Sequence, residues 1–279
     1  MTKNYTRVIV CTAVAAVLLI AAMVVAAFAL FGYADAQWTK GLYFYDHQEY
    51  ICTIGDEVAE FNFMGICVGE KETLPSPEDS VCSLGGVEAE SFRFYCSDRS
   101  GRFTSVQLTV FVRAPQSFTA TEVVFAQAGV ETAYEIGTAV YDRAEGQEAE
   151  GLTLSYSWAI GTGRDLSCVY SVDIVNGFDD AVAIDAVRLE FPYFENFTFS
   201  QGASGEITLP LALEGGASAT LNVHYEGGDR DSAVILQPVI SYTLRGTRYL
   251  ARAKGANVYF DTKSADAVIA LIKERNERA

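Results

Sequence analysis

Histidine and cysteine are the side chains of this sequence best suited to chemistry, and neither forms a recognisable catalytic set. The two histidines, His47 and His224, lie far apart in the sequence. His224 alternates with Val223 and Tyr225, which predicts that it points outward from a strand, and His47 follows Asp46 in an expected turn. Either could act as a general base or metal ligand, but without a second ligand nearby a solvated surface histidine is favoured. The sequence therefore predicts no catalytic residue, no cofactor and no metal ion.

Five cysteines follow the first forty residues, and we expect four of them to form disulfides. The four are Cys52, Cys67, Cys82 and Cys96. Thiols oxidise in an exported segment, and an odd number leaves one unpaired. Local closure favours Cys52–Cys67 and Cys82–Cys96, each with a loop of about 15 residues worth roughly 3 kcal/mol in the chain-entropy model. The other pairings of these four stay open, and Cys168, on the apolar face of an expected strand, is interpreted as a buried free thiol.

Two other patterns suggest specific chemistry. Asn196-Phe197-Thr198 is an N-glycosylation sequon, so we expect Asn196 to carry a glycan if the host is eukaryotic. The acidic loops Asp179-Asp180 and Asp229–Asp231 could bring carboxylates together over calcium. Calcium requires about six to eight oxygen ligands in a defined cage, so two short loops are weak support and solvated turns are favoured.

The stretch from Val8 to Phe31 contains no charged residue and is long enough to span a bilayer. As a helix it would cover roughly 36 Å, against about 30 Å for the hydrocarbon core. Lys3 and Arg7 precede it, and basic flanks stay in the cytoplasm. We therefore predict a cytoplasmic tail over residues 1–7, a single transmembrane signal-anchor helix over residues 8–32, and an extracellular or lumenal remainder.

A cleaved signal peptide is the alternative to a retained anchor. Ala34-Asp35-Ala36 satisfies the small-x-small rule for cleavage after Ala36. However, the apolar region of a signal peptide spans only about 7–15 residues, which favours the anchor. Both interpretations export the rest of the chain.

Composition restricts the partners of the exported part. The chain has 20 basic and 36 acidic residues, a net charge of −16. Such a charge repels nucleic acid and anionic lipid headgroups, so we expect no nucleic-acid partner and expect other proteins to bind instead. The oligomeric state is not determined by the sequence.

The exported chain has the period-two pattern of a mainly β protein, which we divide into three parts. Residues 37–141 form a cysteine-containing β-rich region, and residues 151–262 are expected to form an immunoglobulin-like β-sandwich because short strands alternate with turns every 8–12 residues. The charged residues between them form a linker or a long hairpin loop. Pro238 lies within an expected strand, which predicts an edge position or a bulge. Residues 263–279 are expected to form an amphipathic helix whose apolar face holds Val268, Leu271 and Ile272.

An anchor followed by a sandwich is similar to the architecture of membrane-tethered proteins with LEA-2-type lumenal domains. The part that resembles them is Tyr170–Gly177 leading into Ile184–Phe191, and residues 37–101 have no counterpart there. We interpret the chain as a single-pass membrane-anchored β-sandwich protein that binds other proteins, mediates adhesion or scaffolds a membrane complex without catalysis. The alternatives are a lumenal or extracellular enzyme using carboxylate chemistry and a lipid-handling sandwich of the LEA-2-like type.

Overall fold

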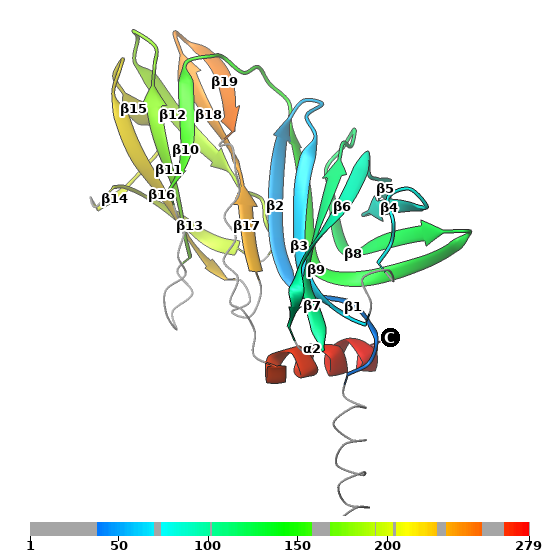
Figure 1. The fold of residues 1–279 in the computed structure, drawn as a ribbon. Helices are drawn as coiled ribbons and strands as arrows, with labels where there is room; N and C mark the ends of the chain where they lie inside the picture. The colour runs from blue at the N-terminus through cyan, green and yellow to red at the C-terminus, as the bar shows by residue number, and fades with distance from the viewer. Residues whose placement is uncertain are drawn as a thin grey trace, which may run out of the picture. The chain divides into compact units, whose positions relative to one another are not determined.

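The computed structural model describes residues 38–69, 74–100, 102–157, 168–192, 194–202, 205–227, 233–252 and 265–278. In this part the chain is mainly β, with one short helix at the carboxyl-terminal end, as the sequence predicts (Figure 1). The expected cytoplasmic tail and signal-anchor helix, residues 1–32, lie outside the described residues. Within the described ranges, no helix combines the length and the apolar character needed to cross a bilayer.

The first sandwich consists of two sheets around one apolar core. The four-stranded sheet has the order β1 (Gly41–Phe44), β3 (Ala59–Val68), β7 (Phe103–Val112), β6 (Ser91–Ser100). The six-stranded sheet has the order β17 (Ala233–Gln237), β2 (His47–Ile54), β9 (Val130–Ala144), β8 (Phe118–Gln127), β4 (Ser80–Leu84), β5 (Val87–Glu88). β2 runs parallel to both of its neighbours. Phe61 and Phe63 of β3 stack on each other in the core that also holds Leu108 of β7 and Ile136 of β9, all of them fully buried.

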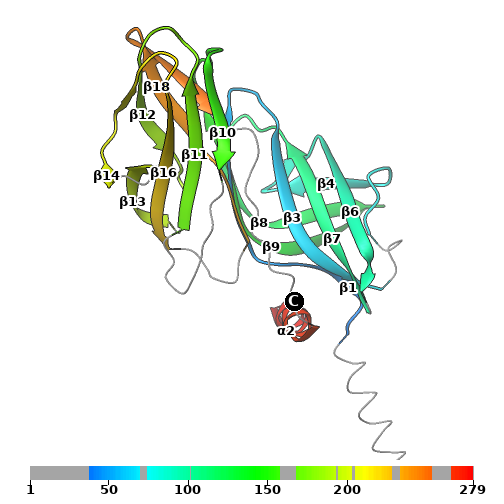
Figure 2. The ribbon, with the colours of Figure 1, turned by 60° about the vertical axis from the view of Figure 1, so that its left-hand side comes forward.

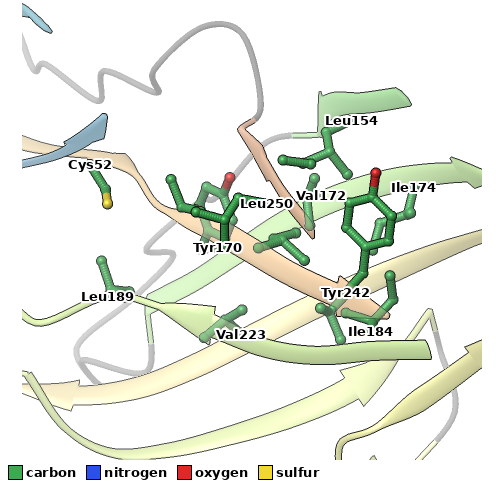
Figure 3. Close-up of a cluster of buried hydrophobic side chains, with 14 of the residues drawn as sticks. Cys52, Leu154, Tyr170, Val172, Ile174, Ile184, Leu189, Val223, Tyr242 and Leu250 are labelled. Carbon is green, nitrogen blue, oxygen red and sulfur yellow. The ribbon is translucent and has the colours of Figure 1, made fainter. Parts of the chain in front are cut away.

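The second sandwich also has two sheets. One has the order β10 (Leu152–Ser157), β11 (Cys168–Asn176), β16 (Ser218–Gly227), β13 (Phe194–Gln201), β14 (Glu206–Ile207). The other has the order β15 (Leu211–Leu213), β12 (Val182–Arg188), β18 (Val239–Leu244), β19 (Thr247–Arg252). Figure 3 shows Tyr170, Val172 and Ile174 of β11 in the core with Ile184 and Tyr242 from the opposite sheet. Each such buried side chain contributes about 1.5–3 kcal/mol of apolar burial.

The two sandwiches share strands. β17 pairs with β2 in the first sandwich, and after Pro238 the same stretch continues as β18 in the second. Pro238 thus separates an edge strand from an inner one, because β17 is the outermost strand of its sheet and a proline removes one ladder donor. Neighbouring residues of β17 enter different cores: Ile235 belongs to the first and Leu236 to the second. Residues 42–262 accordingly form one compact unit.

The charged stretch after residue 141 is partly strand. β9 continues through Ala144, so the loop before β10 is shorter than the linker expected from the sequence. At the other end of β9, a two-residue turn joins it to β8, with positive φ at Ala128 and Gly129. Such left-handed residues match the twist of the paired strands.

The carboxyl-terminal helix α2 covers Ala265–Arg278 and belongs to a compact unit separate from residues 42–262. Val268, Leu271 and Ile272 are buried, with exposures of 0%, 8% and 1%. These are the three side chains that the sequence predicts for its apolar face.

Candidate functional site

The most heavily hydrogen-bonded ionisable side chain of the described residues is Asp142 near the end of β9. Arg188, the last residue of β12, donates two hydrogen bonds to it, from Nε to Oδ2 at 2.6 Å and from an Nη to Oδ1 at 2.7 Å. The Tyr50 hydroxyl of β2 donates to Oδ2 at 2.6 Å, and the Ser117 hydroxyl donates to Oδ1 at 2.9 Å. This two-pronged guanidinium–carboxylate geometry is the strongest form of ion pair in proteins. It joins a strand of the first sandwich to one of the second.

The charge state of Asp142 follows from these partners. Burial by itself raises the pKa of a carboxyl, but the hydrogen bonds from Arg188, Tyr50 and Ser117 outweigh it, and the pKa of Asp142 is lowered. The same pairing raises the pKa of Arg188. Asp142 is therefore a carboxylate with both oxygens occupied, which suits a structural anion and leaves no lone pair directed at a substrate.

Two neighbours of Asp142 are held in their neutral forms. Burial raises the pKa of Tyr50, and the nearby Cys52 and Asp142 add to the effect. Burial raises the pKa of the Cys52 thiol to about 12, with a further contribution from Asp142, whose Oδ2 lies 3.7 Å from the sulfur. A thiol in this state is a poor nucleophile, because the thiolate is the reactive form.

His47 is buried, although the sequence predicts a solvated turn residue. It is the first residue of β2 and is 1% exposed. Its Nδ1 lies 2.8 Å from the Tyr45 carbonyl oxygen, and its Nε2 lies 2.8 Å from the Met64 amide nitrogen. Since that amide can only donate and that carbonyl can only accept, the ring is neutral with its proton on Nδ1. His47 thus ties β2 to β3, and both ring nitrogens are engaged.

Glu49, two residues along β2, ties β2 to β3 in the same way. Its carboxyl accepts from the Asn62 amide at 3.0 and 3.2 Å. The side chain is fully buried, and burial raises the pKa well above its usual value; the Asn62 amide opposes this shift and Glu60 adds to it. His47 and Glu49 together supply acceptors to alternate amides of β3, at Met64 and Asn62.

His224 lies half-buried on the outer face of the second sandwich, on the side that the sequence predicts. Its Nε2 is 3.0 Å from the Ser200 hydroxyl of the neighbouring β13. Asn222, two residues before it, accepts from Ser171 at 2.6 Å and donates to the Gly202 carbonyl at 2.8 Å. These contacts form a row of hydrogen bonds across three strands, and the His224 ring bonds a hydroxyl rather than a carboxylate among the described residues.

The structure shows free thiols at all four cysteines that we expected to pair. Cys52 lies in the core of the second sandwich and Cys67 in that of the first, so the Cys52–Cys67 pairing is not formed. Cys82 is buried in β4 with its pKa raised to about 12 by burial, and Cys96 is exposed in β6 of the facing sheet, so Cys82–Cys96 is not formed either. We predicted these pairs because the cysteines are close in sequence. In the structure, the two cysteines of each pair lie on strand faces that point to different places, since the side chains of a strand alternate between its two faces. Cys168 begins β11.

Asn196 is exposed in β13, where the register against β16 shifts between Glu195 and Thr198. Its φ of 52° is left-handed, a conformation that asparagine tolerates better than most residues. The sequon therefore lies at an irregularity in a strand. Its glycosylation remains a prediction.

Of the two acidic loops considered for calcium, the structure describes only Asp179-Asp180. The Asp180 carboxylate pairs with the guanidinium of Arg245, and Asp229–Asp231 lie outside the described residues. Among the residues that can be placed, no group of three or more His, Cys, Asp or Glu side chains is arranged to hold a metal ion.

Sequence reasoning missed Asp142 and Arg188. Asp142 looked like the start of a charged linker, and Arg188 like an ordinary strand residue. The sequence signal that could have identified Asp142 is its position in the alternation of β9. Val140, Asp142 and Ala144 lie on the same face of the strand, and the two apolar residues lie in the core of the second sandwich. A carboxylate in the buried phase of a strand requires a partner, which its sequence neighbours did not reveal.

No protein-family model matches the sequence, and neither does any curated protein sequence. Solved structures give only distant likenesses. A protein of unknown function from Porphyromonas gingivalis W83 is 9% identical and has a TM-score of 0.23; 76% of this chain and 98% of that one are covered. The carboxyl-terminal domain of the Streptococcus agalactiae AgI/II polypeptide BspA is 8% identical, with a TM-score of 0.20 and coverage of 78% and 98%. Domains 5–6 of the S-layer protein SbsC are 8% identical, with a TM-score of 0.17 and coverage of 77% and 96%. TM-scores this low support no inference about fold or function.

Proposed function

We propose that this chain is a non-catalytic, single-pass membrane-anchored scaffold that binds other proteins through its β-sandwiches on the extracellular or lumenal side of the membrane. Residues 8–32 supply the anchor, and the positive flank ahead of them sets the orientation. The rest of the chain presents sheet faces to its partners.

The observation that carries the proposal is the bond between Asp142 and Arg188 where the two sandwiches share strands. The two-pronged pair between the buried Asp142 and the partly exposed Arg188 favours one geometry, because any other orientation of the strands leaves the buried carboxylate without its partner. β17 and β18 reinforce the connection through Ile235 and Leu236, which enter different cores. A stiff connection of this kind suits a scaffold, which must hold its binding faces at a constant spacing.

We further propose that the second sandwich is immunoglobulin-like. Its sheet orders, β10-β11-β16-β13 and β12-β18-β19, match the ABED and CFG orders of that class when the strands are lettered along the chain. β14 and β15 lie in the connection between the fourth and fifth of these strands, and β15 extends the second sheet beside β12.

Crosslinking in intact cells tests the binding function. The tagged full chain is crosslinked, purified in mild detergent and analysed for co-purifying proteins, and each candidate is then used in turn to capture the chain. We expect at least one protein to be recovered in both directions. His224→Ala should leave this capture unchanged, since in the proposed scaffold its ring only bonds Ser200 across the sheet.

Two results would oppose the scaffold. One is a chain that recovers no partner in either direction. The other is that His224→Ala abolishes the phenotype that the wild-type chain restores in cells lacking it, while the abundance of the chain is unchanged. That result would favour the lumenal enzyme.

A further inference from the structure

The outer face of the four-stranded sheet carries an arginine held between aromatic rings. The Arg93 Cζ of β6 lies 5.0 Å from the ring centroid of Tyr95 and 5.0 Å from that of Phe111. Phe111 lies on the neighbouring β7, diagonal to Arg93, which pairs with Thr109. An arginine over an aromatic face is attracted by the negative charge of the ring's π system. The two rings hold the guanidinium in place without neutralising it.

Arg93 differs from Arg113, Arg188 and Arg245, which each pair with a carboxylate. Arg93 contacts the two rings and forms no ion pair with the described residues, although the chain has a large excess of acidic side chains. Its donors are therefore open to a ligand.

The strand that carries Arg93 lies at an edge. Among the described strands, β6 is the last of its sheet, as Figure 2 shows beside β7 and β3. An edge strand offers main-chain donors and acceptors to an added strand. Tyr95, at 50% exposure, stands two residues from Arg93 on the same face. Arginine and tyrosine are the residue types most enriched at the energetic centres of protein interfaces.

Charge selects the partner. Residues 91–112, which form β6 and β7, contain three arginines and one acidic residue, whereas the whole chain carries a net charge of −16. This hairpin is therefore a positive region on an acidic protein, and it attracts carboxylates.

We propose that β6 and the outer face around Arg93 and Tyr95 bind an extended acidic segment of another protein. The segment adds to the edge of β6, and one of its carboxylates accepts hydrogen bonds from Arg93. The inference rests on the proposed binding function and assigns a surface and a partner chemistry to it.

A designed peptide tests this assignment directly. The probe is a labelled peptide of alternating valine and glutamate, and peptides with glutamine or lysine in place of glutamate are the controls. We expect the full chain in detergent to bind the glutamate peptide in preference to both, and to bind it more weakly as salt is raised. Arg93→Gln should weaken that binding about tenfold, the size expected when a charge-assisted hydrogen bond is lost. Tyr95→Ala should weaken it as well, and circular dichroism checks that the variants fold.

Arg245→Gln is the matched control. Arg245 is also an exposed arginine, but Asp180 already occupies it, so its loss should leave peptide affinity unchanged. Failure of the wild-type chain to prefer the glutamate peptide would overturn the assignment, as would equal losses from Arg93→Gln and Arg245→Gln.

The crosslinked partner separates this inference from the proposed function. If the chain with both Arg93→Gln and Tyr95→Ala still captures the partner, the proposed binding function is retained and the assignment of its surface to β6 is wrong. If light scattering shows that Arg93→Gln converts a dimer to a monomer, the acidic segment belongs to a second copy of the chain, which also overturns the assignment to another protein.

Discussion

At the scale of single residues, Asp142, His47 and Glu49 are buried polar side chains that either replace missing main-chain bonds or bind an opposite charge. Asp142 joins three strands, and His47 and Glu49 cap amides of β3. These residue types do chemistry in enzymes, and here their hydrogen-bonding atoms are engaged inside the fold. For Asp142 and Glu49, substitution should therefore change the free energy of unfolding and its dependence on pH.

Asp142→Asn should destabilise the chain by about 1.5–3 kcal/mol, because it removes the charged acceptor of the hydrogen bonds that Arg188, Tyr50 and Ser117 donate to a buried carboxylate. Urea denaturation at neutral pH measures the loss. Asp56→Asn is the control, since Asp56 is 77% exposed in its pair with Arg143 and such pairs contribute about 1 kcal/mol or less. The lowered pKa of Asp142 also means that its stabilisation is present above the unfolded value, about 3.9, and is lost as the pH falls through the folded value. The acid side of the stability curve should therefore be flatter in the variant.

Glu49→Gln should have the opposite effect at neutral pH. The pKa of Glu49 is raised by burial, so the folded chain keeps its proton while the unfolded chain releases it above about 4.3. Its contribution is thus complete below the unfolded value and declines as the pH rises toward the folded value. Glutamine has no proton to lose and still accepts from the Asn62 amide, so the variant should exceed wild type in stability at pH 7 and match it near pH 4. Equal stability of the two proteins at both pH values would contradict a protonated Glu49, and Glu122→Gln on the exposed face of β8 is the control.

At the scale of elements, Asn176 holds together two turns of the second sandwich. The sequence predicts a hairpin turn at Asn176-Gly177, but the structure ends β11 there with a fully buried side chain. Its Nδ2 donates toward the carbonyl oxygens of Asp180, Leu213 and Glu214 at 2.9, 2.9 and 3.0 Å, and its Oδ1 accepts from the Phe178 amide at 3.0 Å.

Asn176→Asp should destabilise the second sandwich by about 3 kcal/mol, because a carboxylate would replace the donor that faces three carbonyl oxygens. Chemical denaturation measures this, and Asn222→Asp, at a half-buried position on the outer sheet face, should cost less. A loss no larger than that of the control would mean that these bonds contribute little.

Period-two patterning recovered most elements, since alternation reports which face of a strand is buried. Alternation predicted a strand over Ser105–Arg113, which lies within and just beyond β7. Helical spacing predicted the buried face of Val268, Leu271 and Ile272. Alternation did not find β2 over His47–Ile54 in full, because His47 and Glu49 are polar residues buried by contacts with β3 that no local pattern reports. The expected cysteine pairs are not formed for a related reason, since which thiols can meet depends on which core each strand face enters.

At the scale of the whole molecule, shared strands couple the two sandwiches. Ile235→Ala and Leu236→Ala remove neighbouring side chains from different cores, and each should cost about 2–5 kcal/mol. Because β17 belongs to both, calorimetry should show one transition over residues 42–262 that each variant shifts as a whole. Two transitions, with each variant moving only one of them, would show independent sandwiches and remove the basis for a stiff scaffold.

Export of the β-sandwiches is the condition on which the scaffold depends, and thiol labelling of intact cells or sealed vesicles tests it most directly. Val130→Cys places a thiol at a site that is 67% exposed in the hairpin between β8 and β9. Asn4→Cys places one in the expected cytoplasmic tail. Both variants are made with Cys96→Ser and Cys168→Ser, which remove the thiol that is exposed among the described residues and the thiol of Cys168. A membrane-impermeant maleimide should label Val130→Cys on cells, or on vesicles that expose the exported side, and should reach Asn4→Cys only after permeabilisation. Labelling of Val130→Cys only after permeabilisation would contradict the proposal.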